Sequence, residues 1–273
     1  MKIRNILVAF NGSASAESAL RYAASLARGG GIRVTALLAH SEHETVDSHA
    51  AWVPARARQI IAEANAEIIN AVRSKFDALK AELELGDRLR FVEASGRVDM
   101  VIAETARGFD ILILGRPKPG DADSHVTLHP DRIALMSGRP IVVVPQGYDR
   151  EASHAEAAIA WDGSRAAGRA LYDSLQLLED EGRVTLLTVE GTRLPRPVEE
   201  VLDHLALHEV EARHEELALH HGVGRTLLAF TRERNPGFLV MGAYEHSKFR
   251  EDFLGGVTAR VLNEIDIPVL LSH

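Results

Sequence analysis

The residues best suited to chemistry form a glycine-rich stretch near the carboxyl terminus of the chain. Gly242 and Ala243 follow an apolar run. The next helical pattern is preceded by Gly255, Gly256, Val257 and Thr258. Glycine lets a ligand approach the backbone closely, and a helix start offers unpaired N–H groups and the positive end of the helix dipole. The stretch is therefore suited to holding phosphate, although a plain strand-to-helix loop with turn glycines has the same spacing.

Serine and histidine offer two further chemistries, and neither is supported by its spacing. Ser13 and Ser164 each follow a glycine after a strand-like run. Neither lies in the G-x-S-x-G pattern of a nucleophile, so we expect both to cap the helix that follows. The chain has 13 His, of which His204 and His208 are one helical turn apart. They lack the carboxylate-rich spacing of a metal site, so we expect neither a metal site nor a catalytic residue.

Composition and charge exclude several classes of protein. The 273 residues are 46% hydrophobic and contain no Cys, which excludes disulfides, thiolate metal sites and Cys nucleophiles. Residues 1–149 hold 18 of the 31 Lys and Arg and 18 of the 39 Asp and Glu, so the net charge of −8 falls on the rest. That distribution argues against a nucleic-acid surface. With no bilayer-length apolar run and no signal-peptide pattern, we expect a cytoplasmic protein without a membrane partner.

The candidate residues belong to an arrangement of strands and helices that occurs twice in the chain. Apolar strand-like runs alternate with helical patterns, which indicates an α/β fold with a parallel sheet covered on both faces. Phe10–Ser13 matches Trp161–Ser164 at an offset of 151, whereas Gly115 matches Gly242 at an offset of 127. The offset therefore shrinks in the middle of the repeat, and the chain reads as two copies of a βαβαβ-type unit.

The difference between the copies lies in one helix and in the connection. The first half has a long amphipathic helical stretch from Pro54 to about Glu84, which we expect to cover its own sheet. The second half has only about Pro197 to Leu207 at that place. We predict domains over residues 1–147 and 155–273. An exposed connection between them is indicated by Arg150, Glu151 and Ser153.

The motifs resemble those of the universal stress protein family. The resemblance rests on Val8–Ser13, on Asp162–Ser164, and on Gly242 with the later run 255–258, and it covers nearly the whole chain. It implies two tandem Rossmann-like domains, each a five-stranded parallel sheet of order 3-2-1-4-5 with helices on both faces. It also implies ATP or AMP binding at the carboxyl edge of the sheet in some members and in others none.

The resemblance assigns roles to particular residues. Asp162 matches an acidic residue that contacts ribose or a metal ion, and Val189 matches a backbone position that meets adenine. In the glycine-rich loop, Gly242 matches the first glycine and Gly255 the third. The candidate nucleotide-binding residues are Asp162, Gly163, Val189, Gly242, Ala243, Gly255, Gly256, Val257 and Thr258.

Two departures from the family pattern affect this assignment. Glu245 stands where the second glycine is expected, and its carboxylate repels a triphosphate unless a metal ion or an Arg intervenes. Gly256 stands where the family has Ser or Thr, which removes a hydroxyl but keeps an N–H.

The first half departs further from the family pattern. Gly115 is kept, but Pro130 stands near the start of the equivalent helix and donates no N–H. Asn11 replaces the acidic residue. We expect no nucleotide in this half, and we expect Arg116 and Lys118 to be solvated loop charges.

Three functions follow from these observations. The favoured one is a stress-response protein that acts by binding ATP or AMP, with Mg²⁺ or Mn²⁺, in its second half. The others are a slow metal-dependent ATPase or phosphotransferase that uses Asp162, and a scaffold without nucleotide. We also expect the halves to form an intramolecular pseudo-dimer through their last strands, near Pro140–Val144 and Pro268–Leu271, and two chains to form a homodimer.

Overall fold

The computed structural model describes residues 3–41, 55–117, 128–243 and 256–273. The elements of the first half are β1 (Asn5–Ala9), α1 (Ala14–Arg28), β2 (Arg33–His40), α2 (Ala55–Leu83), a 3-10 turn (Gly86–Arg88), β3 (Leu89–Ser95), α3 (Val98–Ala106), β4 (Ile111–Arg116), α4 (Pro130–Ser137) and β5 (Ile141–Pro145). Those of the second half are β6 (Glu156–Ala160), α5 (Arg165–Ser174), β7 (Arg183–Val189), α6 (Glu199–Leu207), β8 (Glu211–Leu217), α7 (Val223–Arg234), β9 (Phe238–Gly242), α8 (Val257–Glu264) and β10 (Val269–Ser272).

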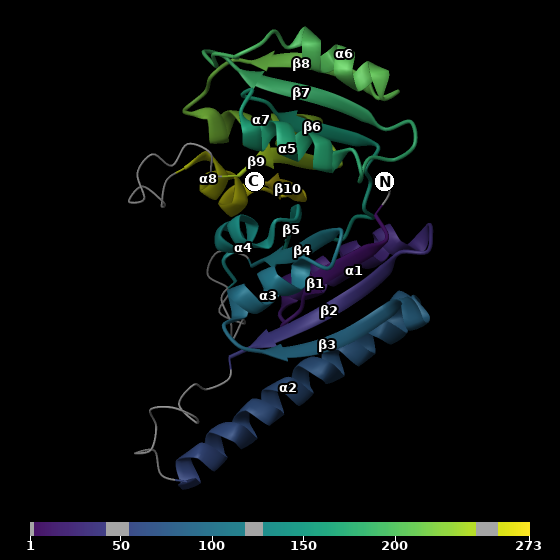
Figure 1. Cartoon of the computed structure of the whole chain (residues 1–273), viewed down its shortest axis with the longest axis vertical. Coiled ribbons are helices and arrows are strands. Elements are labelled where there is room, and N and C mark those ends of the chain that lie inside the picture. Colours follow the sequence, from purple (N-terminus) through teal and green to yellow (C-terminus); the bar gives the residue numbers. More distant parts are fainter. Residues whose placement is uncertain (1–2, 42–54, 118–127, 244–255) are drawn as a thin grey trace.

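The strands form one continuous sheet rather than two separate ones. Its order is β3-β2-β1-β4-β5-β10-β9-β6-β7-β8, so each half has the expected order 3-2-1-4-5 and is parallel within itself. The two halves meet where β5 and β10 pair antiparallel, with Val143 opposite Val269. Figure 1 shows the halves stacked along the long axis with this pair at the middle. The expected pseudo-dimer through the last strands is confirmed.

Apolar side chains of the strands face both ways, as runs such as Ile-Leu-Val-Ala require. On one face, α1, α2, α5 and α6 supply the helical side of the core. On the other face, α3, α4, α7 and α8 do so. Both sheet faces are thus covered by helices, as the sequence predicts. Within the described residues, no helix is both long enough and apolar enough to cross a membrane.

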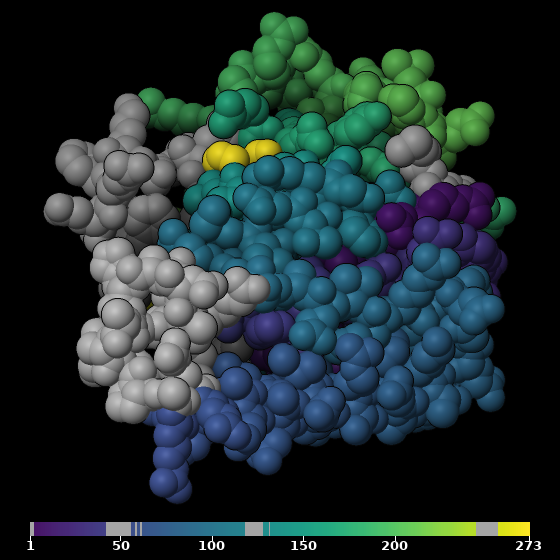
Figure 2. All heavy atoms as spheres, turned by 60° about the horizontal axis from the view of Figure 1, so that its bottom comes forward, coloured from purple at the N-terminus to yellow at the C-terminus, as the bar shows by residue number. Residues whose placement is uncertain are grey.

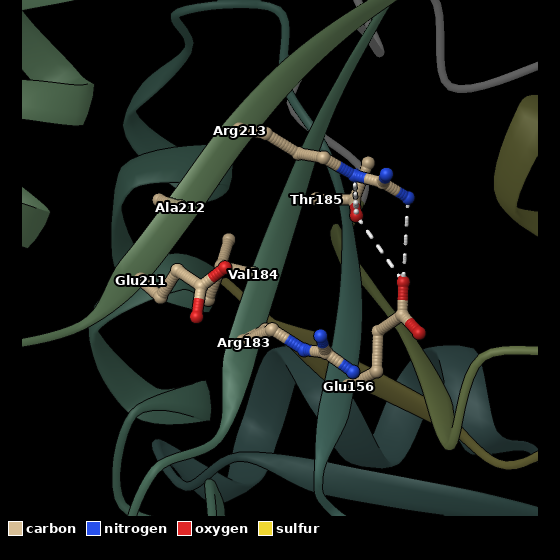
Figure 3. Close-up of a pocket in the computed structure, with 7 residues that line it drawn as sticks. All are labelled: Glu156, Arg183, Val184, Thr185, Glu211, Ala212 and Arg213. Carbon is tan, nitrogen blue, oxygen red and sulfur yellow. Dashed lines mark hydrogen bonds and ion pairs between the residues drawn. The ribbon is translucent and has the colours of Figure 1, made fainter.

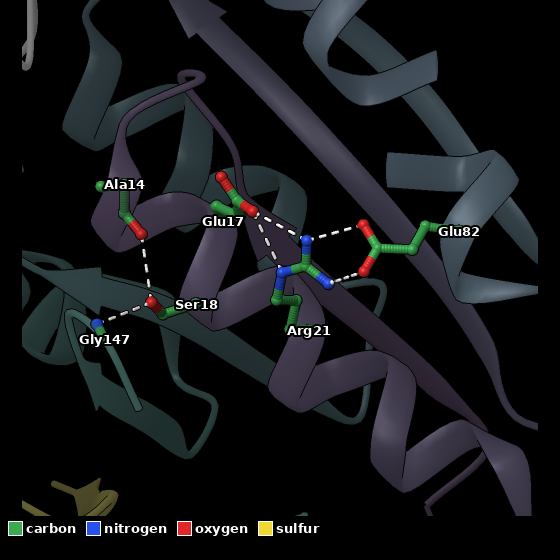
Figure 4. A network of polar contacts seen from close by, with 6 residues as sticks. All are labelled: Ala14, Glu17, Ser18, Arg21, Glu82 and Gly147. Atoms are coloured by element: carbon green, nitrogen blue, oxygen red, sulfur yellow. Dashed lines mark hydrogen bonds and ion pairs between the residues drawn. The ribbon is translucent and has the colours of Figure 1, made fainter. Parts of the chain in front are cut away.

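The carboxyl-terminal half of α2 is held firmly against α1. Val72, Phe76, Leu79 and Leu83 are buried at helical spacing, and Arg21 of α1 donates to both carboxylate oxygens of Glu82 at 2.6 and 2.7 Å (Figure 4). The bidentate pair raises the pKa of Arg21 and lowers the pKa of Glu82.

The amino-terminal half of α2 makes few contacts with the rest of the fold. Residues 62–64 and 66–68 are all exposed, and this part of the helix extends away from the sheet in Figure 1. The expectation that the helix covers its sheet is therefore correct only for its carboxyl-terminal half.

Candidate functional site

The candidate site of the second half begins with the turn after β6. Asp162 accepts the backbone N–H of Ser164 through Oδ1 at 2.9 Å, and Gly163 supplies the positive φ of 73° that the turn needs. Ser164 is the N-cap of α5, because its Oγ accepts the N–H of Ala167 at 3.1 Å. The prediction that this serine caps a helix is confirmed.

The first half builds the same turn with a neutral residue. Asn11 accepts the N–H of Ser13 through Oδ1 at 3.1 Å, Gly12 has a φ of 75°, and Ser13 caps α1 through Ala16 at 3.2 Å. The turn is therefore a general device for starting a helix. What distinguishes the second half is the negative charge of Asp162 at this position.

The strand order brings three of the candidate residues to one edge of the sheet. Strand β6 lies between β7 and β9, with Ala160 opposite Leu187 and Ile159 opposite Val240. Asp162 follows the end of β6, Val189 ends β7 and Ala243 follows the end of β9, so all three lie at the carboxyl ends of neighbouring strands. The chain leaves β6 toward β7 and leaves the adjacent β9 toward β10, on opposite sides, so the edge between β6 and β9 is the topological switch point where such folds bind ligands.

Gly242 is required by packing as well as by any ligand. A Cβ built on Gly242 would lie 2.7 Å from both the carbonyl carbon of Ala166 and the nitrogen of Ala167, at the start of α5. Gly115 in the first half is closer still, since its Cβ would lie 2.1 Å from the carbonyl oxygen of Ser15. Both halves therefore need a glycine where the fourth strand ends against the first helix.

Ala243 is buried and its backbone is already engaged. Its N–H donates to the carbonyl of Ser272 at 2.8 Å, and its carbonyl lies 2.9 Å from Nδ1 of His273. The end of the chain thus supports the strand end at which the glycine-rich loop begins. Gly255 and Glu245 lie outside the described residues.

The other wall of the site is partly closed. The carbonyl of Val189, assigned to adenine by resemblance, accepts the N–H of Thr192 at 3.0 Å. Pro195, between β7 and α6, packs against the turn, because its Cδ would lie 2.3 Å from a Cβ on Gly163. A ligand at this edge would approach along β9 and α8 rather than over Gly163.

Helix α8 begins at the same edge, and its N-cap residue offers no side-chain cap. Gly256 is its N-cap and supplies no side-chain hydrogen bond to the first turn, whose N–H groups have no partners within the helix. Apart from its chain neighbours, none of the residues that the structure describes lies within 4 Å of a Cβ built on Gly256. Val257 is 39% exposed, whereas Thr258 is buried.

The corresponding helix start in the first half is closed. Helix α4 begins with Pro130, which has no N–H, and its N-cap His129 offers no side-chain cap. Instead His129 Nδ1 lies 2.9 Å from Oδ2 of Asp99 at the start of α3. The first half therefore lacks the donor that α8 has at its first helical position.

Arg116 does not behave as a solvated loop charge, and that expectation is wrong. It ends β4, and its Nη1 and Nη2 donate to the carbonyls of Asn263 at 2.9 Å and Ile265 at 2.6 Å. These carbonyls end α8, so a residue of the first half holds the far end of the candidate helix. Burial lowers the pKa of Arg116. The contact exists because β5 and β10 join the halves. Lys118 lies outside the described residues.

A polar hollow lies at the opposite edge of the sheet, over the amino ends of β6, β7 and β8 (Figure 3). Arg213 donates through Nε to Thr185 Oγ1 at 3.1 Å, and its Nη2 lies 3.6 Å from Glu156 Oε1. Arg183 and Glu211 complete the lining. The charges of opposite sign balance one another, and no candidate residue from the sequence lies there. Across the described ranges, no group of three or more His, Asp or Glu is arranged to hold a metal ion.

Comparison with known proteins agrees with this architecture. The family model described as "Universal stress protein family" matches residues 2–145 and again residues 157–273. Universal stress protein Slr1230 of Synechocystis sp. is 25% identical over 297 aligned residues, which cover 98% of this chain and 99% of that protein.

Solved structures share the fold over the whole chain. A universal stress protein from Archaeoglobus fulgidus DSM 4304 has a TM-score of 0.72 at 14% identity, covering 99% of this chain and 96% of that one. A putative universal stress protein from Pseudomonas aeruginosa UCBPP-PA14 has a TM-score of 0.57 at 16% identity, with coverage of 99% and 93%. With two family segments in tandem and a double βαβαβ sheet, the chain belongs to the universal stress protein family.

Proposed function

We propose that this stress-family protein acts by binding an adenine nucleotide, ATP or AMP, in one of two units, residues 155–273, and that residues 1–147 bind none. The observation that carries the proposal is the difference between two equivalent helix starts. Helix α8 begins with an exposed glycine N-cap that no other described residue crowds, whereas α4 begins with Pro130. A phosphate at α8 would accept first-turn N–H groups and meet the positive end of the helix dipole.

The remaining contacts follow from the geometry of the edge. Asp162 follows β6 and Ala243 follows the neighbouring β9, and in this proposal Asp162 would accept a hydrogen bond from a ribose hydroxyl. The sequence also has Glu245 in the glycine-rich stretch, and the net negative charge of the chain falls on its second half. A triphosphate would therefore need a bound Mg²⁺ or Mn²⁺ to reduce repulsion. A monophosphate such as AMP has a smaller charge to neutralise.

A scaffold without nucleotide is the second candidate, and two observations favour it. The Val189 carbonyl already accepts a hydrogen bond from Thr192, and packing against α5 alone accounts for Gly242. If the hydrogen bond of Val189 and the packing of Gly242 fully account for these two residues, the second half needs no ligand.

Calorimetric titration with ATP and with AMP, each with and without Mg²⁺, tests the proposal when done on wild type and on Val257→Pro. Val257 is the first residue of α8, where proline fits a helix and removes one N–H. The preceding Gly256, at ψ 165°, already has the extended conformation that a following proline requires. Loss of one donor to a charged phosphate should weaken binding about tenfold or more.

The matched control is Val223→Pro, the same change at the first residue of α7, which is also about 38% exposed. It should leave affinity unchanged. Absence of heat and of any thermal shift for wild type would support the scaffold and end the proposal. Binding that Val257→Pro does not weaken would place the nucleotide elsewhere.

A further inference from the structure

The length of α2 is not explained by the sheet that it covers. Its counterpart in the second half, α6, has 9 residues, whereas α2 has 29. Both helices follow the second strand of their unit and pack on the same face of the continuous sheet. The short helix is therefore sufficient for the structural task, and the additional turns of α2 call for another role.

The additional turns expose large apolar side chains. Ile60 is 57% exposed and Ile68 is 39% exposed, whereas Val72, Phe76 and Leu79 further along the helix are buried. Figure 2 shows the amino-terminal end of α2, in blue, projecting beyond the neighbouring surface. Unlike isolated surface apolar residues, these lie on one face, because Ala57, Ile60, Ala64 and Ile68 are spaced by three or four residues.

Charges beside this apolar face have the arrangement of a self-complementary surface. At 3.6 residues per turn, Arg56, Glu63 and Glu67 fall within about 40° of one another around the helix, on one flank of the apolar face. When two copies of a helix pair antiparallel about a two-fold axis, each flank meets the same flank of its partner. The basic end of the flank in one copy then faces the acidic end in the other.

The apolar residues match in the same register. With the axis near residue 62, Ile60 faces Ala64 of the second copy and Ile68 faces Ala57, so that each large side chain lies opposite a small one. Arg56 then lies opposite Glu67. A parallel pairing would instead set each Ile against the same Ile of the second copy, and it would bring each flank against the opposite flank, so that Arg56 and Glu67 would not meet.

We propose that the amino-terminal half of α2, residues 56–68, is a docking surface for the same segment of a second copy of this chain, paired antiparallel. This surface would be the interface of the homodimer. Its formation does not depend on nucleotide binding by the second half. A single helix pair of this length buries less than the ~1,600 Å² of a standard stable interface, so the dimer should dissociate on dilution.

Sedimentation velocity over a range of protein concentrations at low salt tests the docking surface. Wild type should pass from monomer to dimer as concentration rises, and Ile60→Lys should raise the dissociation constant about tenfold or more. Leu207→Lys is the matched control, because Leu207 is 84% exposed on α6, and it should change nothing. A wild type that stays monomeric, or a dimer indifferent to Ile60→Lys, would overturn the proposal.

Charge exchange tests the antiparallel register itself. Arg56→Glu alone sets two acidic residues against each other, and Glu67→Arg alone sets two basic residues against each other, so each variant should be more monomeric than wild type. An equal mixture of the two single variants should form a heterodimer, because every opposed pair is then of opposite sign. Failure of the mixture to associate more strongly than either variant alone contradicts the register.

Discussion

The hydroxyl oxygen of Tyr22 and Nε2 of His154 lie 2.5 Å apart, in a buried contact that joins the two halves of the chain. Tyr22 is on α1 and His154 precedes β6. On the other side of the ring, Nδ1 lies 2.9 Å from the carbonyl of Leu177. A carbonyl only accepts, so Nδ1 carries the proton and Nε2 accepts the tyrosine hydroxyl. The neutral imidazole therefore satisfies both partners, and burial disfavours the imidazolium.

This geometry predicts a stability that depends on pH. Burial lowers the pKa of His154 to about 4, from an ordinary value of 6.5. Above pH 6.5 the residue is neutral in both states and stability is complete. As pH falls from about 6.5 to 4 the unfolded chain takes up a proton that the folded chain does not, so stability falls by about 1.4 kcal/mol per pH unit, roughly 3 kcal/mol in all.

Urea unfolding at several pH values checks this prediction. Between pH 4 and 6.5, the unfolding free energy should change less steeply with pH for His154→Gln than for wild type. The difference in slope should reach up to about 1.4 kcal/mol per pH unit, which corresponds to one bound proton. His208→Gln removes an exposed histidine and serves as control, with a slope like that of wild type. Equal slopes for wild type and His154→Gln would show that the residue titrates normally.

Arg116 should be a major contact between the halves. Arg116→Ala would leave the carbonyls of Asn263 and Ile265 without their donors, at a cost of about 1–3 kcal/mol. Arg139→Ala is a matched control, because Arg139 donates twice to a carbonyl within the first half, that of Arg107, and is exposed. Chemical denaturation should show the larger loss for Arg116→Ala. An equal or smaller loss would mean that the contact between halves adds little stability.

The two packing glycines should tolerate no side chain. A Cβ on Gly115 or on Gly242 would meet helix backbone at 2.1 or 2.7 Å, so Gly115→Ala and Gly242→Ala should each destabilise by about 1–3 kcal/mol, with Gly115→Ala the more severe. Gly29→Ala is the control, because Gly29 has a φ of −78° and nothing within 4 Å of the added carbon. Thermal unfolding would contradict the packing role if Gly242→Ala behaved like Gly29→Ala.

The charge of Asp162 can be removed without disturbing its turn. Asn11 makes the same turn in the first half, so Asp162→Asn should keep the fold and weaken ATP binding about fivefold, through loss of a charged acceptor. Asn11→Asp should not create a second site, since Pro130 still lacks its N–H. Calorimetry on the two variants checks both statements. Unchanged or tighter binding by Asp162→Asn would remove Asp162 from the site.

The fold could be predicted from the sequence because its signals are local and occur twice. Apolar runs, turn glycines and capping serines such as Ser13 and Ser164 each specify a short segment, and the repeat sets their order. Contacts between the halves could not be predicted in this way. His154 is buried by Tyr22, 132 residues away, and Arg116 reaches Ile265, 149 residues away. Neither position differs in local pattern from an exposed polar residue.

The candidate site was only partly predictable, because one sequence signal serves two purposes. A glycine at the end of a strand permits phosphate to approach, and it also permits a helix to approach, as at Gly115 and Gly242. Sequence order placed Asp162, Val189 and Ala243 at strand ends, and the strand order β9-β6-β7 makes those three strands neighbours. The carbonyl of Val189 accepts the N–H of Thr192 in a turn, and the pattern of apolar residues does not predict that turn.

Native mass spectrometry of the purified chain with excess ATP or AMP counts the nucleotides bound per chain, and so it distinguishes one nucleotide site from two or none. We expect one nucleotide per chain, held by the half that contains α8, and we expect Val257→Pro to lose it. Two nucleotides per chain would contradict the closed helix start of the first half, and none would contradict nucleotide binding by the second.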